Sequence, residues 1–204
     1  METVEKRPFV VRAGQWVFPR RLLIPLPAVL IALLFFRPQP IYGRYESLGI
    51  LVSGLLVAAG VGLRIWAGGC AGDHTRTGTI GAPQLATNGP YAFVRNPIYL
   101  GNMILGLGMI GLVRDPRLLV LYAIVFPILY VMIVPAEEEF LRQRFSADYE
   151  RYCASVPRMI PRLRPWRGRT EGRFDWRVLR GEAWIVSYLV AIYAAMRVAE
   201  HLRS

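Results

Sequence analysis

Charge is scarce in this chain of 204 residues, and acidic charge is the scarcer kind. Charged residues make up 19% of the sequence, below the roughly 25% that is usual for a water-soluble domain. Only 14 residues are acidic, whereas 25 are basic, and 24 of the basic residues are arginine. Hydrophobic residues make up 54%, which excludes intrinsic disorder. The long apolar runs make a nucleic-acid binder the poorer explanation of the positive charge, so we expect no nucleic-acid partner.

Cysteine and histidine are rare as well. Cys70 and Cys153 stand far apart, so no disulfide framework is expected. His74 and His201 show no metal-ligand spacing with them, and we therefore expect no metal site. The polar N-terminal stretch METVEKRPFVVRAGQW lacks the basic-then-apolar form of a cleaved signal peptide.

Five apolar segments are present, and strand patterns are nearly absent. These segments predict an all-α fold, a polytopic membrane helical bundle of about five transmembrane helices, with residues 1–204 as a single membrane domain. The segments cover residues 22–36, 47–67, 98–113, 118–136 and 183–199. The third and fourth are joined by four residues only, which predicts an antiparallel hairpin. The small residues Gly54, Ala58 and Gly62 recur every four positions and predict a helix-packing stripe.

The basic residues indicate the sidedness. With five spans, 18 of the basic residues fall on the side of the N-terminus and 6 on the other side. The positive-inside tendency then predicts a cytosolic N-terminus and an active site at the cytosolic face. Residues 162–182 mix arginine with Trp166, Phe174 and Trp176, which predicts an interfacial segment that lies on anionic membrane lipids. The alternative interpretation of this segment is a nucleic-acid patch.

Two segments carry candidate chemistry. The first is GPYAFVRNPIYLG, residues 89–101, in which Pro97 opens a helix and Arg95, Asn96 and Tyr99 gather at its start. The alternative interpretation of this first segment is an ordinary structural turn before a helix.

The second segment, residues 135–161, continues the fourth apolar helix. Glu138 begins an aromatic and apolar stripe there, whereas Glu139 is expected to pair along the helix. The stripe contains Glu138, Leu141, Phe145, Tyr149 and Tyr152.

Together the motifs GPYxxxRxPxYxG and EExxLxxxFxxxYxxYxxxVPRxIP resemble those of the isoprenylcysteine carboxyl methyltransferase and phospholipid methyltransferase family of integral membrane methyltransferases. The resemblance covers the core motifs at residues 85–161. It implies S-adenosylmethionine as the methyl donor. The residues that it implies for cofactor binding are Tyr91, Val94, Arg95, Asn96, Pro97, Tyr99, Gly101, Glu137, Glu138 and Tyr149.

Within that resemblance Arg95 suits the carboxylate of the donor and Glu138 suits its ammonium group. His74 is a further catalytic candidate beside them. The sequence departs from the family pattern at two positions. Asn96 stands where the family has histidine, so the position cannot titrate near neutral pH. Ser146 stands where a glycine is usual, and we expect that exchange to cost little.

A lipid or lipidated acceptor that enters from the bilayer fits this membrane setting, with the carboxylate of an isoprenylcysteine preferred. The alternatives are a phospholipid amine N-methyltransferase and a non-catalytic lipid-binding scaffold of the same fold. Some related folds catalyse NADPH-dependent reduction, but the second motif favours methyl transfer. The sequence carries no signal for the oligomeric state.

Overall fold

The computed structural model describes residues 13, 16–17, 39, 41–72, 84–169 and 171–202. Every regular element within these ranges is helical, which confirms the all-α prediction. The elements are η2 (Gly43–Tyr45), α3 (Glu46–Ala71), η4 (Gly89–Ala92), α4 (Pro97–Val113), α5 (Pro116–Ser155) and α6 (Val178–His201). The predicted span at residues 22–36 and the candidate His74 lie outside the described residues.

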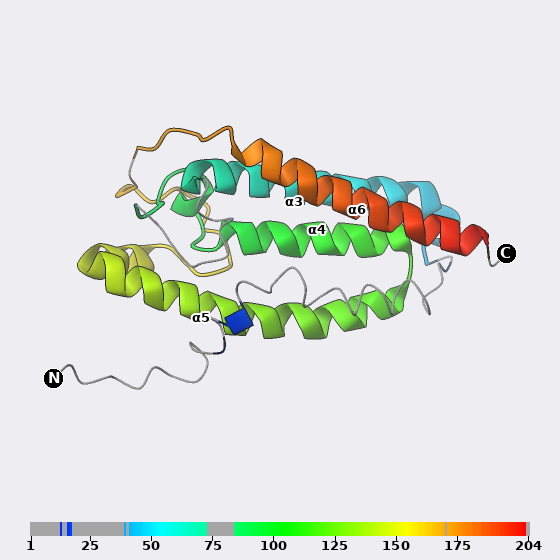
Figure 1. Cartoon of the computed structure of the whole chain (residues 1–204), viewed down its shortest axis with the longest axis horizontal. Coiled ribbons are helices and arrows are strands. Elements are labelled where there is room, and N and C mark those ends of the chain that lie inside the picture. The colour runs from blue at the N-terminus through cyan, green and yellow to red at the C-terminus, as the bar shows by residue number, and fades with distance from the viewer. Residues whose placement is uncertain are drawn as a thin grey trace.

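The four long helices lie side by side. α4 packs most closely on α3, while α6 also packs on α3 and α5 packs along α4 (Figure 1). Three described helices are long and apolar enough to cross a membrane: Gly43–Ala71, Pro116–Ser155 and Val178–Val198. The apolar helix Pro97–Val113 is shorter. Four of the five predicted segments are therefore helices, and the count of five spans is not confirmed.

Small residues let α3 and α4 approach each other, but on a different stripe of α3 from the predicted one. A Cβ at Gly60 would lie 2.6 Å from the backbone nitrogen of Leu105, and one at Gly108 would lie 2.7 Å from the carbonyl oxygen of Ser53. Among the described residues, no atom would lie within 4 Å of a Cβ at Gly54 or Gly62. The predicted stripe is therefore not the surface of α3 that meets α4, because four-residue spacing alone does not tell which face of an apolar helix meets its neighbour.

The predicted hairpin between α4 and α5 is confirmed. α4 ends at Arg114, whose φ of 62° is left-handed. Asp115 caps the next helix by accepting a hydrogen bond from the backbone N–H of Arg117 at 3.0 Å. Pro116 occupies the first turn of α5, where the missing N–H costs no hydrogen bond.

α5 continues well beyond the predicted end of its apolar segment and bends at Ser146. The backbone there has φ 42° and ψ −116°, outside the helical region. A residue with a side chain adopts such a conformation only at a cost in conformational free energy, whereas glycine adopts it without steric strain. The expectation that serine costs little at this position was therefore wrong, because the sequence did not reveal the bend.

A buried ion pair holds α6 on the bundle. Arg64 of α3 donates from Nε to Oε2 of Glu182 at 3.0 Å and from Nη2 to Oε1 at 2.9 Å. Its third nitrogen, Nη1, donates to the side-chain oxygen of Asn102 on α4. The side chains of Arg64 and Glu182 are only 10% and 6% exposed. The one arginine inside the apolar segment of α3 thus joins three helices.

Candidate functional site

The first motif forms a tight turn against the end of α3. Gly89 has φ 54°, and a Cβ on it would collide with the sulfur of Cys70, so this position requires glycine. The short helix η4 follows, and its backbone places Arg95 and Asn96 immediately before α4. Asn96 occupies the N-cap position, but its side chain makes no capping hydrogen bond.

The second motif returns to meet the first. After α5 ends, the chain runs back along the turn, where the N–H of Arg95 donates to the carbonyl of Pro157 at 2.9 Å. The N–H of Arg162 donates to the carbonyl of Phe93 at 3.0 Å. The side-chain amide of Asn96 donates to the carbonyl of Arg158 at 3.1 Å. The structure thus brings together two motifs that the sequence separates by a whole helix.

Three charged side chains meet at this junction. Arg158 donates from Nε to Oε1 of Glu138 at 3.0 Å and from Nη2 to Oε2 at 2.5 Å. Arg95 reaches the same carboxylate, with Nη1 3.5 Å from Oε1. The Glu138 side chain is 5% exposed, whereas that of Arg158 is 49% exposed. The hydrogen bonds to Glu138 raise the pKa of the Arg158 guanidinium above its ordinary value.

Two polar atoms beside this carboxylate are buried without a hydrogen-bond partner among the described residues. They are Nε of Arg95 and the hydroxyl oxygen of Tyr130. Tyr130 lies within electrostatic range of Arg158, Glu138 and Arg95. Buried polar groups normally have partners, so these two atoms are candidates for hydrogen bonds with a polar ligand. Nη1 of Arg95, by contrast, donates to the sulfur of Cys153 at 2.7 Å.

The predicted aromatic stripe of α5 is confirmed and forms the floor of the junction. Tyr149 and Tyr152 are buried, and Leu141 and Phe145 pack against them. The hydroxyl of Tyr152 donates to the carbonyl of Tyr91 at 2.8 Å. Burial raises the pKa of the Tyr91 phenol, which keeps that hydroxyl protonated.

Of the remaining predicted site residues, Tyr99, Val94 and Pro97 lie near the junction, whereas Gly101 does not. Tyr99 donates its hydroxyl to Oε1 of Glu137 at 3.0 Å, and its ring lies edge-on to that of Tyr130. Val94 and Pro97 are buried in the turn before α4. Gly101 lies elsewhere, because a Cβ on it would meet Arg64 and the Gly60 carbonyl in the contact with α3.

Glu139 behaves as predicted and lies outside the site. Its carboxylate accepts hydrogen bonds from Arg142 at 3.2 Å and from Gln143 at 2.8 Å on the exposed face of α5. Sequence reasoning missed Arg158 and Tyr130. The arginine of the Val-Pro-Arg step in the second motif was a usable signal for Arg158, whereas a tyrosine in an apolar helix gave none for Tyr130.

Comparisons with known proteins found one matching family model and several relatives. Residues 48–148 match the family model described as phospholipid methyltransferase. The chain is 34% identical over 77 residues to protein-S-isoprenylcysteine O-methyltransferase A of Arabidopsis thaliana, covering 38% of this chain and 39% of that protein. It is 35% identical over 77 residues to the protein-S-isoprenylcysteine O-methyltransferase of Schizosaccharomyces pombe, covering 38% and 33%.

A third relative carries a different kind of name. The chain is 30% identical over 84 residues to the cobalt-zinc-cadmium resistance protein CzcN of Cupriavidus metallidurans, covering 41% of this chain and 38% of that protein. The chain thus spans well under half the length of these three relatives. No solved structure matches it.

Residues 48–148, just under half of the chain, thus resemble the phospholipid methyltransferase family. Two of the three relatives are named as isoprenylcysteine O-methyltransferases. Together with the three apolar helices, the family indicates an integral membrane protein.

Proposed function

We propose that this chain transfers a methyl group from S-adenosylmethionine to a lipid or prenylated acceptor, preferably the carboxylate of an isoprenylcysteine. The observation that carries the proposal is the buried Glu138 carboxylate between Arg95 and Arg158. Both family motifs meet there, beside two polar atoms that have no hydrogen-bond partner in the part of the chain that the structure describes. The relatives named as isoprenylcysteine methyltransferases support the acceptor class.

The residues at the junction fit the amino-acid end of such a donor. Arg95 has a buried N–H without a partner among the described residues, which suits a carboxylate. Glu138 suits an ammonium group once Arg158 gives way, and Arg158 is exposed enough to do so. When bound, the donor supplies a methyl group that its sulfonium already activates, so the protein has mainly to position two reactants.

The acceptor preference rests on protonation. Arg95 and Arg158 are permanently protonated, and Glu138 is tied to both of them. None of these three groups is placed to remove a proton from an acceptor. A carboxylate needs no base before it attacks a methyl group, whereas an ammonium group must first lose a proton.

The family description favours a second candidate, methylation of a phospholipid amine. Transfer of a radioactive methyl group to an S-farnesylated cysteine and to phosphatidylethanolamine, each in mixed micelles, separates the two. We expect label on the farnesylated cysteine and none on a matched compound whose carboxylate is blocked as an amide. Label on phosphatidylethanolamine alone would establish the second candidate.

Calorimetric titration of the detergent-purified protein with S-adenosylmethionine tests the donor. Saturable binding is expected for an enzyme. Absence of binding in a protein that unfolds cooperatively on heating would favour the non-catalytic scaffold instead.

We also propose that the junction faces the cytosol, which the distribution of basic residues supports. Labelling of introduced cysteines in intact cells with a membrane-impermeant thiol reagent tests this. The cysteines are Glu5→Cys and Arg203→Cys, each introduced into a chain that carries Cys70→Ala and Cys153→Ala. Protection of position 5 with labelling of position 203 is expected. Equal labelling of both would contradict an odd number of spans.

A further inference from the structure

Six exposed arginines lie between the end of α5 and the first turn of α6, and none of them forms an ion pair among the described residues. They are Arg164, Arg167, Arg169, Arg173, Arg177 and Arg180. Arg142 and Arg151 on α5 differ, since Arg142 pairs with Glu139 and Glu150, and Arg151 pairs with Asp148. Only Glu171 and Asp175 offset the six positive charges within residues 164–180. We call these six arginines the arginine surface.

The backbone that carries the arginine surface is attached to the bundle. The N–H of Trp166 donates to the carbonyl of Ala92 at 2.9 Å, and that of Asp175 donates to the carbonyl of Gly69 at 2.8 Å. The rings of Trp166 and Tyr152 pack with centroids 5.6 Å apart. The segment therefore holds its arginines at the end of the bundle, beside the start of α6 (Figure 1).

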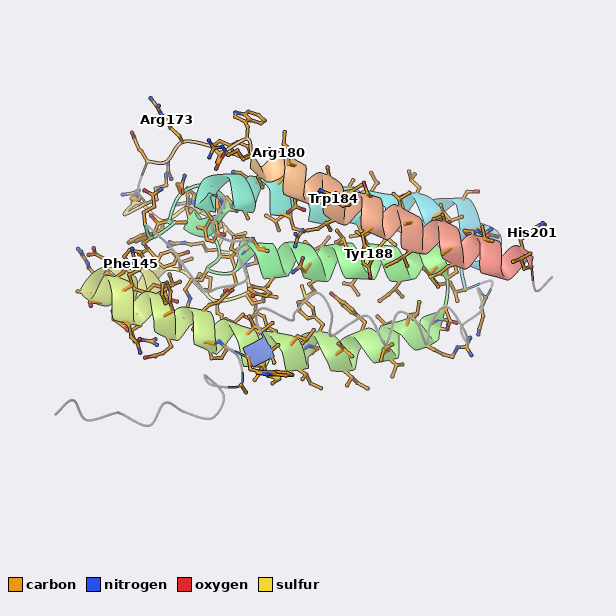
Figure 2. The ribbon with its side chains drawn as sticks, in the orientation of Figure 1. Phe145, Arg173, Arg180, Trp184, Tyr188 and His201 are labelled. Carbon is orange, nitrogen blue, oxygen red and sulfur yellow. The ribbon has the colours of Figure 1, made fainter. Side chains whose placement is uncertain are left out.

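Large apolar side chains accompany these arginines and are also exposed. Leu163 is 98% exposed, Ile160 81% and Trp176 71%. Arg173 points away from the helices, and Trp184 follows in the first turns of α6 (Figure 2). Arginine mixed with leucine and tryptophan is typical of segments that lie at a membrane surface.

We propose that the arginine surface binds the phosphate groups of anionic phospholipids, with Leu163 and Ile160 entering the outer acyl region. Arg180 lies in the first turn of α6, a helix long and apolar enough to cross the membrane, so the surface lies within reach of headgroups. Unpaired arginines near a membrane attract anionic lipid. This proposal does not depend on the proposed methyl transfer.

The test measures lipid selectivity of the whole chain in phosphatidylcholine vesicles. Electron paramagnetic resonance of a spin-labelled lipid separates protein-bound from free lipid, and spin-labelled phosphatidylglycerol is compared with spin-labelled phosphatidylcholine. We expect at least about a threefold preference for phosphatidylglycerol. The preference should largely disappear at high salt, because salt screens exposed charge.

A charge-matched pair of variants locates the effect. Arg164→Gln with Arg173→Gln should lose most of the preference, whereas Arg142→Gln with Arg151→Gln removes the same charge from paired arginines and should retain it. Thermal unfolding of both variants checks that each is folded. Equal loss in the two variants, or no preference in the wild type, would overturn the proposal.

Two further measurements test the apolar contact and the rival ligand. Leu163→Trp should gain fluorescence that brominated phosphatidylcholine quenches, more strongly than in Ala154→Trp at the exposed end of α5. Equal quenching of the two tryptophans would show that Leu163 does not enter the membrane. Binding of a fluorescent oligonucleotide that Arg164→Gln with Arg173→Gln abolishes, without any lipid preference, would assign the surface to nucleic acid and overturn the proposal.

Discussion

Arg158 reaches from the protein surface onto the buried carboxylate of Glu138 and donates two hydrogen bonds to it. The backbone of Arg158 is fixed, because its carbonyl accepts the amide of Asn96. Its side chain is half exposed, so it can move into water when another cation takes its place beside Glu138. In the ligand-free protein this arginine thus provides the cation that a buried carboxylate requires.

The first prediction concerns Glu138. Glu138→Gln should weaken S-adenosylmethionine binding, because a charge-assisted hydrogen bond in a partly desolvated site is worth about 1.5–3 kcal/mol, or roughly 10- to 150-fold in affinity. Glu139→Gln is the matched control, since its partners lie on the exposed face. Calorimetric titration of both variants measures the difference. Equal losses would show that the site was assigned to the wrong carboxylate.

The second prediction concerns Arg158, whose substitution should change the affinity for S-adenosylmethionine in the opposite direction. Arg158→Gln should lower the thermal stability of the free protein by about 1–3 kcal/mol, since Glu138 loses its main partner. The same change should raise the affinity for S-adenosylmethionine severalfold, because the ligand's ammonium no longer competes with a guanidinium. Melting curves with and without the ligand report both quantities. A lower affinity would mean that Arg158 itself holds the ligand.

Asn96 joins the two motifs. Asn96→Ala should lower stability by about 0.5–1.5 kcal/mol, because the hydrogen bond to the Arg158 carbonyl is lost. S-adenosylmethionine binding should weaken less than in Glu138→Gln, and Asn96→His should be tolerated. The melting temperature and the S-adenosylmethionine affinity of Asn96→Ala, measured together, decide whether Asn96 contributes to binding or only to stability. A pure loss of stability would leave Asn96 with a purely structural role.

The backbone conformation of Ser146 carries a steric cost, because its φ is positive. Ser146→Gly should stabilise the protein by about 1 kcal/mol, because glycine adopts a φ of 42° without the steric penalty. The neighbouring Ala147→Gly, which adds the same flexibility within α5, should instead cost about 1 kcal/mol. Thermal unfolding measures both. Destabilisation by Ser146→Gly would contradict the bend.

The ion pair between Arg64 and Glu182 should be essential as a pair. Glu182→Gln leaves a buried guanidinium without its carboxylate and should cost about 3–5 kcal/mol. The double change Arg64→Met with Glu182→Leu removes both charges and should recover much of that loss. Resistance to proteolysis of α6 in detergent provides the readout. A double variant less stable than Glu182→Gln would show that the charges do more than satisfy each other.

Part of this fold was predictable from the sequence by itself. The apolar segments specified the helices, because a run of some 20 apolar residues can satisfy its backbone in a membrane only as a helix. The spacing of Glu138, Tyr149 and Tyr152 specified their shared face, since helical periodicity alone decides which residues of one helix align. For the same reason Glu139 was correctly placed outside the site.

Tertiary structure decided the rest. The contacts of Arg158 with Glu138 and of Arg64 with Glu182 join residues from separate elements, and no local periodicity carries that information. The packing stripe of α3 was missed because Gly54 and Gly60 look equally suitable until a neighbouring helix selects one of them. The cost of Ser146 depends on a bend within α5, which the helical periodicity of the sequence did not reveal.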